Sequence, residues 1–205
     1  MPSIYGLKPR FQNLLRPVTN ALARAGVTAN QVTLFAMLIS LATGAAIFRS
    51  HSQRALLLLP IILFLRMALN AIDGMLAREH NQKTSLGAIL NELGDVLSDS
   101  ALYLPLAVVP GFNPALVVLL VLCAVFTEMT GVIAVQIGAS RRYDGPMGKS
   151  DRAFIFGALG LLLALKLPIV PVVPYVLWIV LALLLLTIVN RARKALAELR
   201  GSAAR

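Results

Sequence analysis

Long apolar runs, separated by short polar segments, recur along the chain and limit what it can fold into. Runs of about 20 residues match the length that an α-helix needs to cross a bilayer. Inside lipid every backbone N–H and C=O group must be paired within the chain, so helices are the default. The mean hydropathy of +0.80 agrees with this interpretation, as does a hydrophobic share of 58%.

We therefore predict an all-α integral membrane protein with six transmembrane helices. The predicted spans are roughly 31–49, 55–77, 87–110, 114–138, 152–167 and 171–190, of which the fifth is short. No soluble segment is long enough to stand alone. We expect one membrane domain over residues 1–205, with an N-terminal segment over 1–28 and a six-helix bundle over 29–195.

The N-terminal segment reads "KPRFQNLLRPVTNALARAG" and mixes apolar and basic residues at helical spacing. Its apolar positions are Phe11, Leu14, Leu15, Val18 and Leu22. This pattern predicts an amphipathic helix lying in the membrane interface. A plain juxtamembrane linker is the alternative.

The basic residues are distributed unequally between the two sides of the predicted bundle. With a cytoplasmic N-terminus, only Arg49, Arg54 and Lys166 lie on the far side and Arg66 lies in a span, out of 19 Lys and Arg residues. The positive-inside rule then places both termini in the cytoplasm. The net charge of +10 needs only anionic lipid headgroups as partners, and no nucleic acid. The compact, Arg- and Ala-rich chain suggests a bacterial inner membrane.

Polar residues gather on one face of each of two consecutive helices, the second and third predicted spans. On the first helix they are Arg66, Asn70, Asp73, Gly74 and Ala77; on the second they are Gly87, Asn91, Asp95 and Asp99, with Glu92 at the edge. The short loop "REHNQKTS" makes the two helices antiparallel neighbours, so their polar ends meet on the cytoplasmic side. Asp73 lies ~8 Å along the axis from Arg78, and Asp95 lies ~12 Å from Gly87.

Carboxylate and amide oxygens in this arrangement suit a hard cation such as Mg²⁺, Mn²⁺ or Ca²⁺. The single Cys123 excludes a cysteine-based metal site. Gly74 and Gly87 leave room for a ligand, and the planar fork of Arg78 can hold a phosphate. The alternative is a salt-bridged packing site in which Arg66 is the counter-ion.

The same stretch resembles the signature of the CDP-alcohol phosphotransferases, D-x2-D-G-x2-A-R-x8-G-x3-D-x3-D. Here it reads Asn70-x2-Asp73-Gly74-x2-Ala77-Arg78-x8-Gly87-x3-Asn91-x3-Asp95. All spacings hold, and two of the eight residues differ. The segment "VTANQVTL" at 27–34 is similar to the family's T-P-N-x2-T.

The resemblance implies a membrane phosphatidyltransferase that moves a phosphatidyl group from CDP-diacylglycerol to an alcohol and releases CMP. Asn70, Asp73, Asn91 and Asp95 would be the metal positions, with Asp95 also the general base. The expected substrate-binding residues are Asn30, Thr33, Gly74, Arg78, Thr84, Gly87, Lys149 and Arg152. The resemblance also implies Mg²⁺ or Mn²⁺, an active site facing the cytoplasm, and a homodimer.

The two asparagines change the charge of the expected metal site. Four aspartates would balance two divalent cations, whereas Asp73 and Asp95 balance one. Three states stay open: one tight and one weaker ion, two ions with Glu92 or Asp99 recruited, or a site without turnover. We expect activity, because Asp73, Asp95, both glycines and Arg78 are retained.

Other readings concern the acceptor and the remaining polar residues. Glycerol phosphate, inositol phosphate, serine and a lipid headgroup all remain open as acceptors. A CDP-alcohol:diacylglycerol phosphotransferase and a non-catalytic membrane scaffold are the alternative functions. The segment "SRRYDGPMGKSDR" also carries Arg141 and Arg142, for which ordinary rim charge is the alternative to a role in the pocket, whereas it applies less to Lys149 and Arg152. Glu128 is either functional or a structural partner of a residue such as Arg66.

Overall fold

The computed structural model describes residues 8–50 and 52–203, and every regular element in these ranges is a helix. The elements are α1 (Lys8–Arg24), α2 (Ala29–Ser50), the 3-10 helix η2 (Gln53–Leu57), α3 (Leu58–Glu79), α4 (Ser85–Tyr103), the 3-10 helix η3 (Leu104–Val108), α5 (Pro114–Gln136), α6 (Lys149–Ala164) and α7 (Val173–Ala203). The predicted all-α class is confirmed. Residues 1–7 of the N-terminal segment lie outside the described ranges.

Four segments are long and apolar enough to cross a bilayer. They are Ala29–Ser50, Gln53–Glu79, Pro114–Gln136 and Val173–Gly201. The chain is therefore a helical membrane protein, but only four of the six predicted spans meet this standard. The other two fall short for physical reasons: α4 carries three acidic residues in 19, and α6 has 16 residues.

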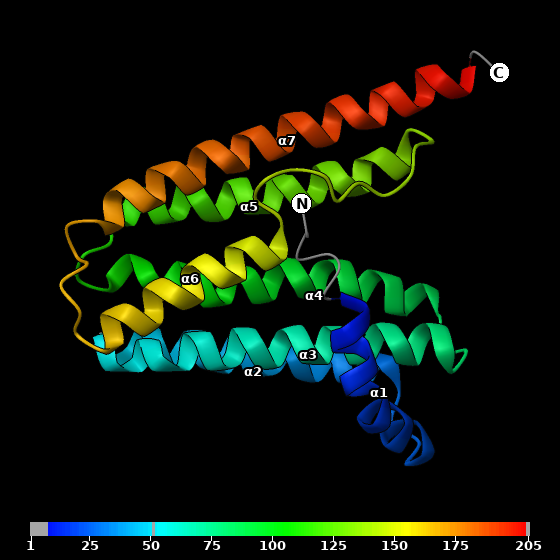
Figure 1. Cartoon of the computed structure of the whole chain (residues 1–205), viewed down its shortest axis with the longest axis horizontal. Helices are drawn as coiled ribbons and strands as arrows, with labels where there is room; N and C mark the ends of the chain where they lie inside the picture. Colours follow the sequence, from blue (N-terminus) through cyan, green and yellow to red (C-terminus); the bar gives the residue numbers. More distant parts are fainter. Residues whose placement is uncertain (1–7, 51, 204–205) are drawn as a thin grey trace.

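Helices α2 to α7 run along the long axis of the molecule, whereas α1 lies across them (Figure 1). Helix α2 packs along both α3 and α4, α5 packs along α7, and α6 packs on α3 and η2. The α3–α4 turn and the end of α7 lie at one end of the bundle (Figure 1). The connections after α4 and α6 lie at the other end.

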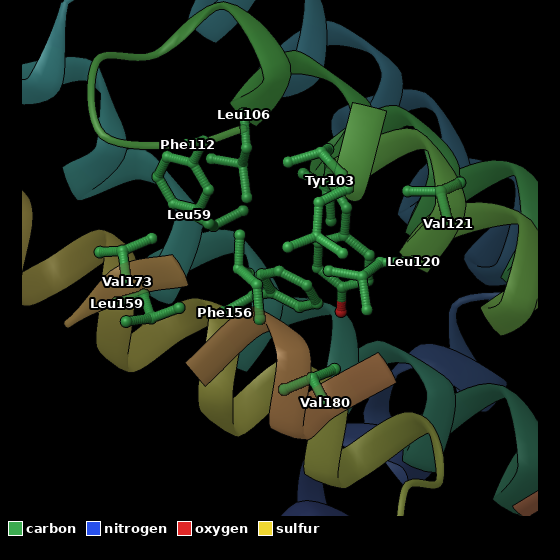
Figure 2. Close-up of a cluster of buried hydrophobic side chains, with 14 of the residues drawn as sticks. Leu59, Tyr103, Leu106, Phe112, Leu120, Val121, Phe156, Leu159, Val173 and Val180 are labelled. Carbon is green, nitrogen blue, oxygen red and sulfur yellow. The ribbon is translucent and has the colours of Figure 1, made fainter. Parts of the chain in front are cut away.

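A large apolar core contains buried side chains from each of the helices α2 to α7 and from both 3-10 helices. Figure 2 shows Tyr103 beside Leu120 and Phe156, and the rings of Tyr103 and Phe156 stack with centroids 4.3 Å apart. Elsewhere α2 and α4 touch through their backbones, because a Cβ on Gly44 would lie 1.9 Å from the carbonyl oxygen of Ala101. This close approach lies near the C-terminal ends of α2 and α4, at the end of the bundle away from the α3–α4 turn.

Helix α1 packs against α3 through both apolar and charged contacts. The rings of Phe11 and Phe64 meet edge to face at 6.2 Å, and Arg16 pairs with Glu79 at 2.9 Å. Leu15 and Leu22 pack on a small cluster with α2 and α3. The side chain of Leu14, by contrast, is 74% exposed. The helix therefore exposes part of its apolar surface beside the bundle.

Candidate active site

The turn between α3 and α4 brings the two predicted polar faces together. The side chain of Thr84 caps α4 by accepting a hydrogen bond from the Gly87 amide at 2.9 Å. Across the helix pair, the Asn70 amide donates to the Asp95 carboxylate at 3.2 Å. Asn70, Asp73, Asn91 and Asp95 form what we call the signature face. Its members lie on consecutive helices of the chain; α2 packs along both helices, and the Asn70–Asp95 hydrogen bond joins α3 to α4 directly.

Asp73 is a buried carboxylate with an uncharged partner. Its side chain accepts a hydrogen bond from the Thr33 hydroxyl at 2.8 Å, and the residue is 5% exposed. Among the described residues, no Lys or Arg forms an ion pair with it. A buried carboxylate without a counter-ion is costly, so this position favours a bound cation.

Asp95 is held by three side-chain donors, two from α3 and one from the start of α6. Its Oδ1 accepts hydrogen bonds from Arg66 at 3.3 Å and from Asn70 at 3.2 Å. The Lys149 ammonium at the start of α6 also donates to Oδ1. Arg66 additionally donates to the Asp95 carbonyl oxygen at 3.0 Å. The carboxylate is thus positioned firmly and already neutralised in part.

Two small clusters of expected substrate residues flank the signature face. The Arg78 guanidinium folds back over Gly74, where a Cβ would lie 3.0 Å from its Nη1. On the other side, Asn30 donates to the Thr84 hydroxyl at 3.4 Å, and a Cβ on Gly87 would lie 2.7 Å from the Asn30 side-chain oxygen. The structure therefore brings these residues together with Thr33 beside the face.

Two expected site residues stand apart from the others. Asn91 is exposed on α4, one turn before Asp95. Arg152 is 1% exposed and donates to Asp99 at 2.8 Å and to Glu128 at 3.1 Å. Its contacts in the structure are those of a counter-ion in the core, and a contact with substrate stays a prediction for Arg152.

Buried and partly buried ion pairs link α3, α4, α5, α6 and α7 behind the signature face. We call this set the arginine network, and it consists of Arg66, Glu92, Asp99, Glu128, Arg141, Arg152 and Arg191. Asp99 pairs with Arg66 and Arg152, and Glu92 pairs with Arg141 at 2.8 Å. Neither acid is therefore free to restore the charge that the two asparagines lack.

The ion-pair partners of Glu128 differ from the partner considered in the sequence analysis. It pairs with Arg141, Arg152 and Arg191 rather than with Arg66. Arg191, one of the basic residues that the charge distribution places on the cytoplasmic side, is 1% exposed and also donates to the Thr127 carbonyl oxygen. A glutamate within an apolar run signals that a cationic partner must exist. The sequence does not say which arginine supplies it.

Gly131 allows Arg141 to reach this network. A Cβ at this position would lie 1.7 Å from the Arg141 Nη1 and 2.6 Å from the Arg142 carbonyl oxygen. Because Gly131 has no side chain, the Arg141 guanidinium has room to lie against α5 at this point.

The segment between α5 and α6 is fixed by a second, more exposed set of ion pairs. Asp144 pairs with Arg142 at 2.6 Å and with Lys194 at 2.7 Å. Burial acts to raise the pKa of Asp144, but hydrogen bonds from Lys194 and Arg142 outweigh it and lower that pKa. These pairs hold the segment that leads into Lys149 against α7.

The signature face offers a partial shell for a divalent cation. Within residues 8–50 and 52–203, no three Asp, Glu, His or Cys side chains come together as a metal-binding group. Oxygens from Asn70 or Asn91 are needed to extend the set of Asp73 and Asp95. Because Asp95 is already paired with Lys149 and Arg66, the donor set fits one divalent ion near Asp73 better than two.

Comparisons with known proteins show the family of the chain. Residues 26–189 match the family described as CDP-alcohol phosphatidyltransferase. The chain is 54% identical over 163 residues to the inner membrane protein YnbA of Escherichia coli, with 80% of this chain and 81% of that protein covered. It is 30% identical over 174 residues to the phosphatidylinositol phosphate synthase of Mycolicibacterium smegmatis, with 78% and 73% covered.

Solved structures share the fold. The phosphatidylinositol phosphate synthase of Mycobacterium tuberculosis with CDP-DAG bound superposes with a TM-score of 0.71 at 22% identity, covering 87% of this chain and 92% of that one. A second structure of that enzyme, in complex with manganese and citrate, also gives a TM-score of 0.71 at 22% identity, with 87% of each chain covered.

Proposed function

Because the chain belongs to the CDP-alcohol phosphatidyltransferase family, we propose that it moves a phosphatidyl group from CDP-diacylglycerol to an alcohol and releases CMP. The observation that carries the proposal is the direct contact between Asn70 on α3 and Asp95 on α4, with Asp73 buried alongside. This hydrogen bond connects the part of the signature on α3 with the part on α4. The CDP-DAG bound to the mycobacterial relative supports the choice of donor.

The proposed reaction is a single displacement at phosphorus. The acceptor hydroxyl oxygen forms a bond to the phosphorus that carries diacylglycerol, and the bond from this phosphorus to the bridging oxygen breaks. CMP leaves with that oxygen, and Asp95 takes the hydroxyl proton. Arg78 holds a phosphate of the donor, while Asn30, Thr33 and Thr84 line the nucleotide side.

We propose Mg²⁺ or Mn²⁺ as the cofactor, with one ion bound tightly and any second ion more weakly. Asp73 would hold the tight ion with help from Asn70 or Asn91, since amide oxygens are acceptable ligands. When bound, the ion neutralises charge on the donor diphosphate. The manganese complex of the mycobacterial relative supports this choice.

The test is CMP release by the purified protein in detergent with CDP-diacylglycerol, Mg²⁺ or Mn²⁺, and one acceptor at a time. We would compare glycerol 3-phosphate, inositol phosphate and serine, and follow the lipid product by mass spectrometry. The Asp73→Asn/Asp95→Asn variant is the isosteric control, and we expect it to be inactive. Binding of the donor without CMP release from any acceptor would instead indicate a scaffold.

The relatives support an anionic acceptor. Curated relatives include phosphatidylinositol phosphate synthases, and Arg78 and Lys149 place positive charge beside the proposed catalytic centre. A phosphorylated polyol is therefore the first acceptor to try. Comparing the lipids of cells with and without the protein would identify the product directly.

The proposed setting is a bacterial inner membrane with the site facing the cytoplasm. Helices α4 and α6 lie alongside the four apolar spans (Figure 1), so we propose that they complete a six-helix bundle. The exposed Leu14 and Val18 of α1 fit a helix resting in the membrane interface. The name of the Escherichia coli relative supports the inner membrane. A homodimer stays a prediction, which the mass of the protein in detergent would check.

A further inference from the structure

We propose that Lys149 is a built-in cation of the catalytic centre, and that its ammonium neutralises Asp95 in the position where a divalent ion would otherwise bind. This inference rests on the proposed function only in taking the signature face as the metal site. It assigns Lys149 a role toward the metal, in addition to any contact with substrate.

The position of Lys149 is fixed by the start of α6. The Gly148 amide donates to the Asp151 carboxylate at 2.9 Å, which caps the helix and sets the direction of its first turn. From there the Lys149 ammonium reaches the Oδ1 of Asp95. Its side chain is 30% exposed and that of Asp95 is 25% exposed, so the pair lies at the edge of the open side of the site.

The charges around the face explain why a lysine is needed there. Asn70 and Asn91 leave only Asp73 and Asp95 as anions on the face. Arg66 is shared between Asp95 and Asp99, so it neutralises Asp95 only in part. The Lys149 ammonium supplies the rest. A divalent ion on Asp95 would then meet two cationic side chains, and their repulsion would oppose its binding.

Asp73 is left as the carboxylate that still requires a cation. Its hydrogen-bond partners are neutral, namely the Thr33 hydroxyl and the Gly74 backbone, and the residue is 5% exposed. The Lys149 charge also acts on Asp73, but its direct contact is with Asp95. The face therefore holds two different cation positions: an exchangeable one at Asp73, and a covalently tethered one at Asp95. The amide of Asn70, which contacts Asp95, fits between them without adding charge.

The experiment is a Mn²⁺ titration of the purified protein without substrate, with free Mn²⁺ read from its electron paramagnetic resonance signal. The variants are Lys149→Met, Asp95→Asn and their combination, and Lys149→Arg keeps the charge. Lys83→Met is the matched control, because Lys83 is an exposed lysine of the α3–α4 loop. We expect Lys149→Met to bind Mn²⁺ at least roughly tenfold more tightly, the usual scale for a neighbouring charge.

The gain should depend on Asp95. It should disappear in the combined variant, and Lys149→Arg and Lys83→Met should resemble the starting protein. Mn²⁺ should also raise the unfolding temperature of Lys149→Met more than that of the starting protein. No gain from Lys149→Met, or the same gain when Asp95 is already Asn, would overturn the proposal. Neither readout uses turnover, so a failure of the transferase assay is a separate result.

Discussion

The arginine network and the signature face share helices α3 and α4 but treat their carboxylates differently. Asp99 and Glu128 are each paired with at least two arginines. Asp73 is bound by a hydroxyl, and Asp95 by a lysine, an amide and one shared arginine. Asp99 and Glu128 are buried among arginines, whereas the carboxylates of the face are held mainly by a hydroxyl, an amide and an ammonium.

This difference follows from the chemistry of the partners. A guanidinium holds a carboxylate with several fixed donors and stays charged, so a buried arginine pair is difficult to exchange. A hydroxyl or an ammonium on a flexible stem has no such fixed geometry. We propose from this comparison that the network stabilises the bundle and that the face binds ligands.

The largest expected effect is on turnover, and it concerns Asp95, the residue of the signature face that contacts Arg66 of the arginine network. Asp95→Asn should keep donor binding and lower CMP release by roughly 10²–10⁴-fold, because an amide cannot take the acceptor proton. CMP release and CDP-diacylglycerol binding would be measured on the same preparation, with Lys83→Met as the control. Near-normal CMP release would remove Asp95 from the role of base.

The next effect separates the two regions by stability. Asp99→Asn leaves Arg66 and Arg152 without their shared carboxylate, and breaking a buried pair typically costs about 3–5 kcal/mol. Asp73→Asn is the matched control, since it makes the same change without leaving an arginine unpaired. Unfolding would be followed in detergent. Equal losses in the two variants would contradict the distinction between network and face.

A smaller effect tests the network from the α5 side. Gly131→Ala should displace Arg141 from Glu92 and Glu128, since the new Cβ would overlap its guanidinium. We expect a loss of about 1–3 kcal/mol, typical of overpacking. In Gly94→Ala the new Cβ would lie 3.7 Å from Thr33, an ordinary contact, so this variant is the control. A Gly131→Ala protein as stable as the control would show that Arg141 moves freely.

The smallest effect concerns the exposed pairs of Asp144. The pKa of Asp144 is lowered in the folded protein from its ordinary value of 3.8. These pairs therefore stabilise the fold fully at a pH above 3.8, and the stabilisation is lost as the pH falls through the pKa of the folded state. Asp144→Asn should therefore lower stability at pH 7 by up to about 1 kcal/mol. The difference from the starting protein should shrink below pH ~4. A difference that grows on acidification would be the contrary result.

Much of the candidate site could be predicted from helical spacing. The four-residue steps on α3 and α4 correctly placed Asn70 and Asp95 on facing surfaces, and the short loop made the helices antiparallel. The family resemblance, not the spacing, implied that Asn30 and Thr33 lie beside the site, and each contacts a predicted residue there. In the structure Glu92 and Asp99 are paired with arginines. Neither acid is therefore available to bind a second divalent ion, which favours the state with one tightly bound ion.

The sequence by itself determined the helical membrane class, the antiparallel pair and the residues that share its polar face, because these depend on local periodicity and on hydrophobic length. Tertiary structure alone decided which cation neutralises which carboxylate. Lys149, Arg152 and Arg191 come from α6 and α7, far along the chain from their partners. Their pairing depends on how distant helices rotate and pack, and periodicity within one helix carries no information about that.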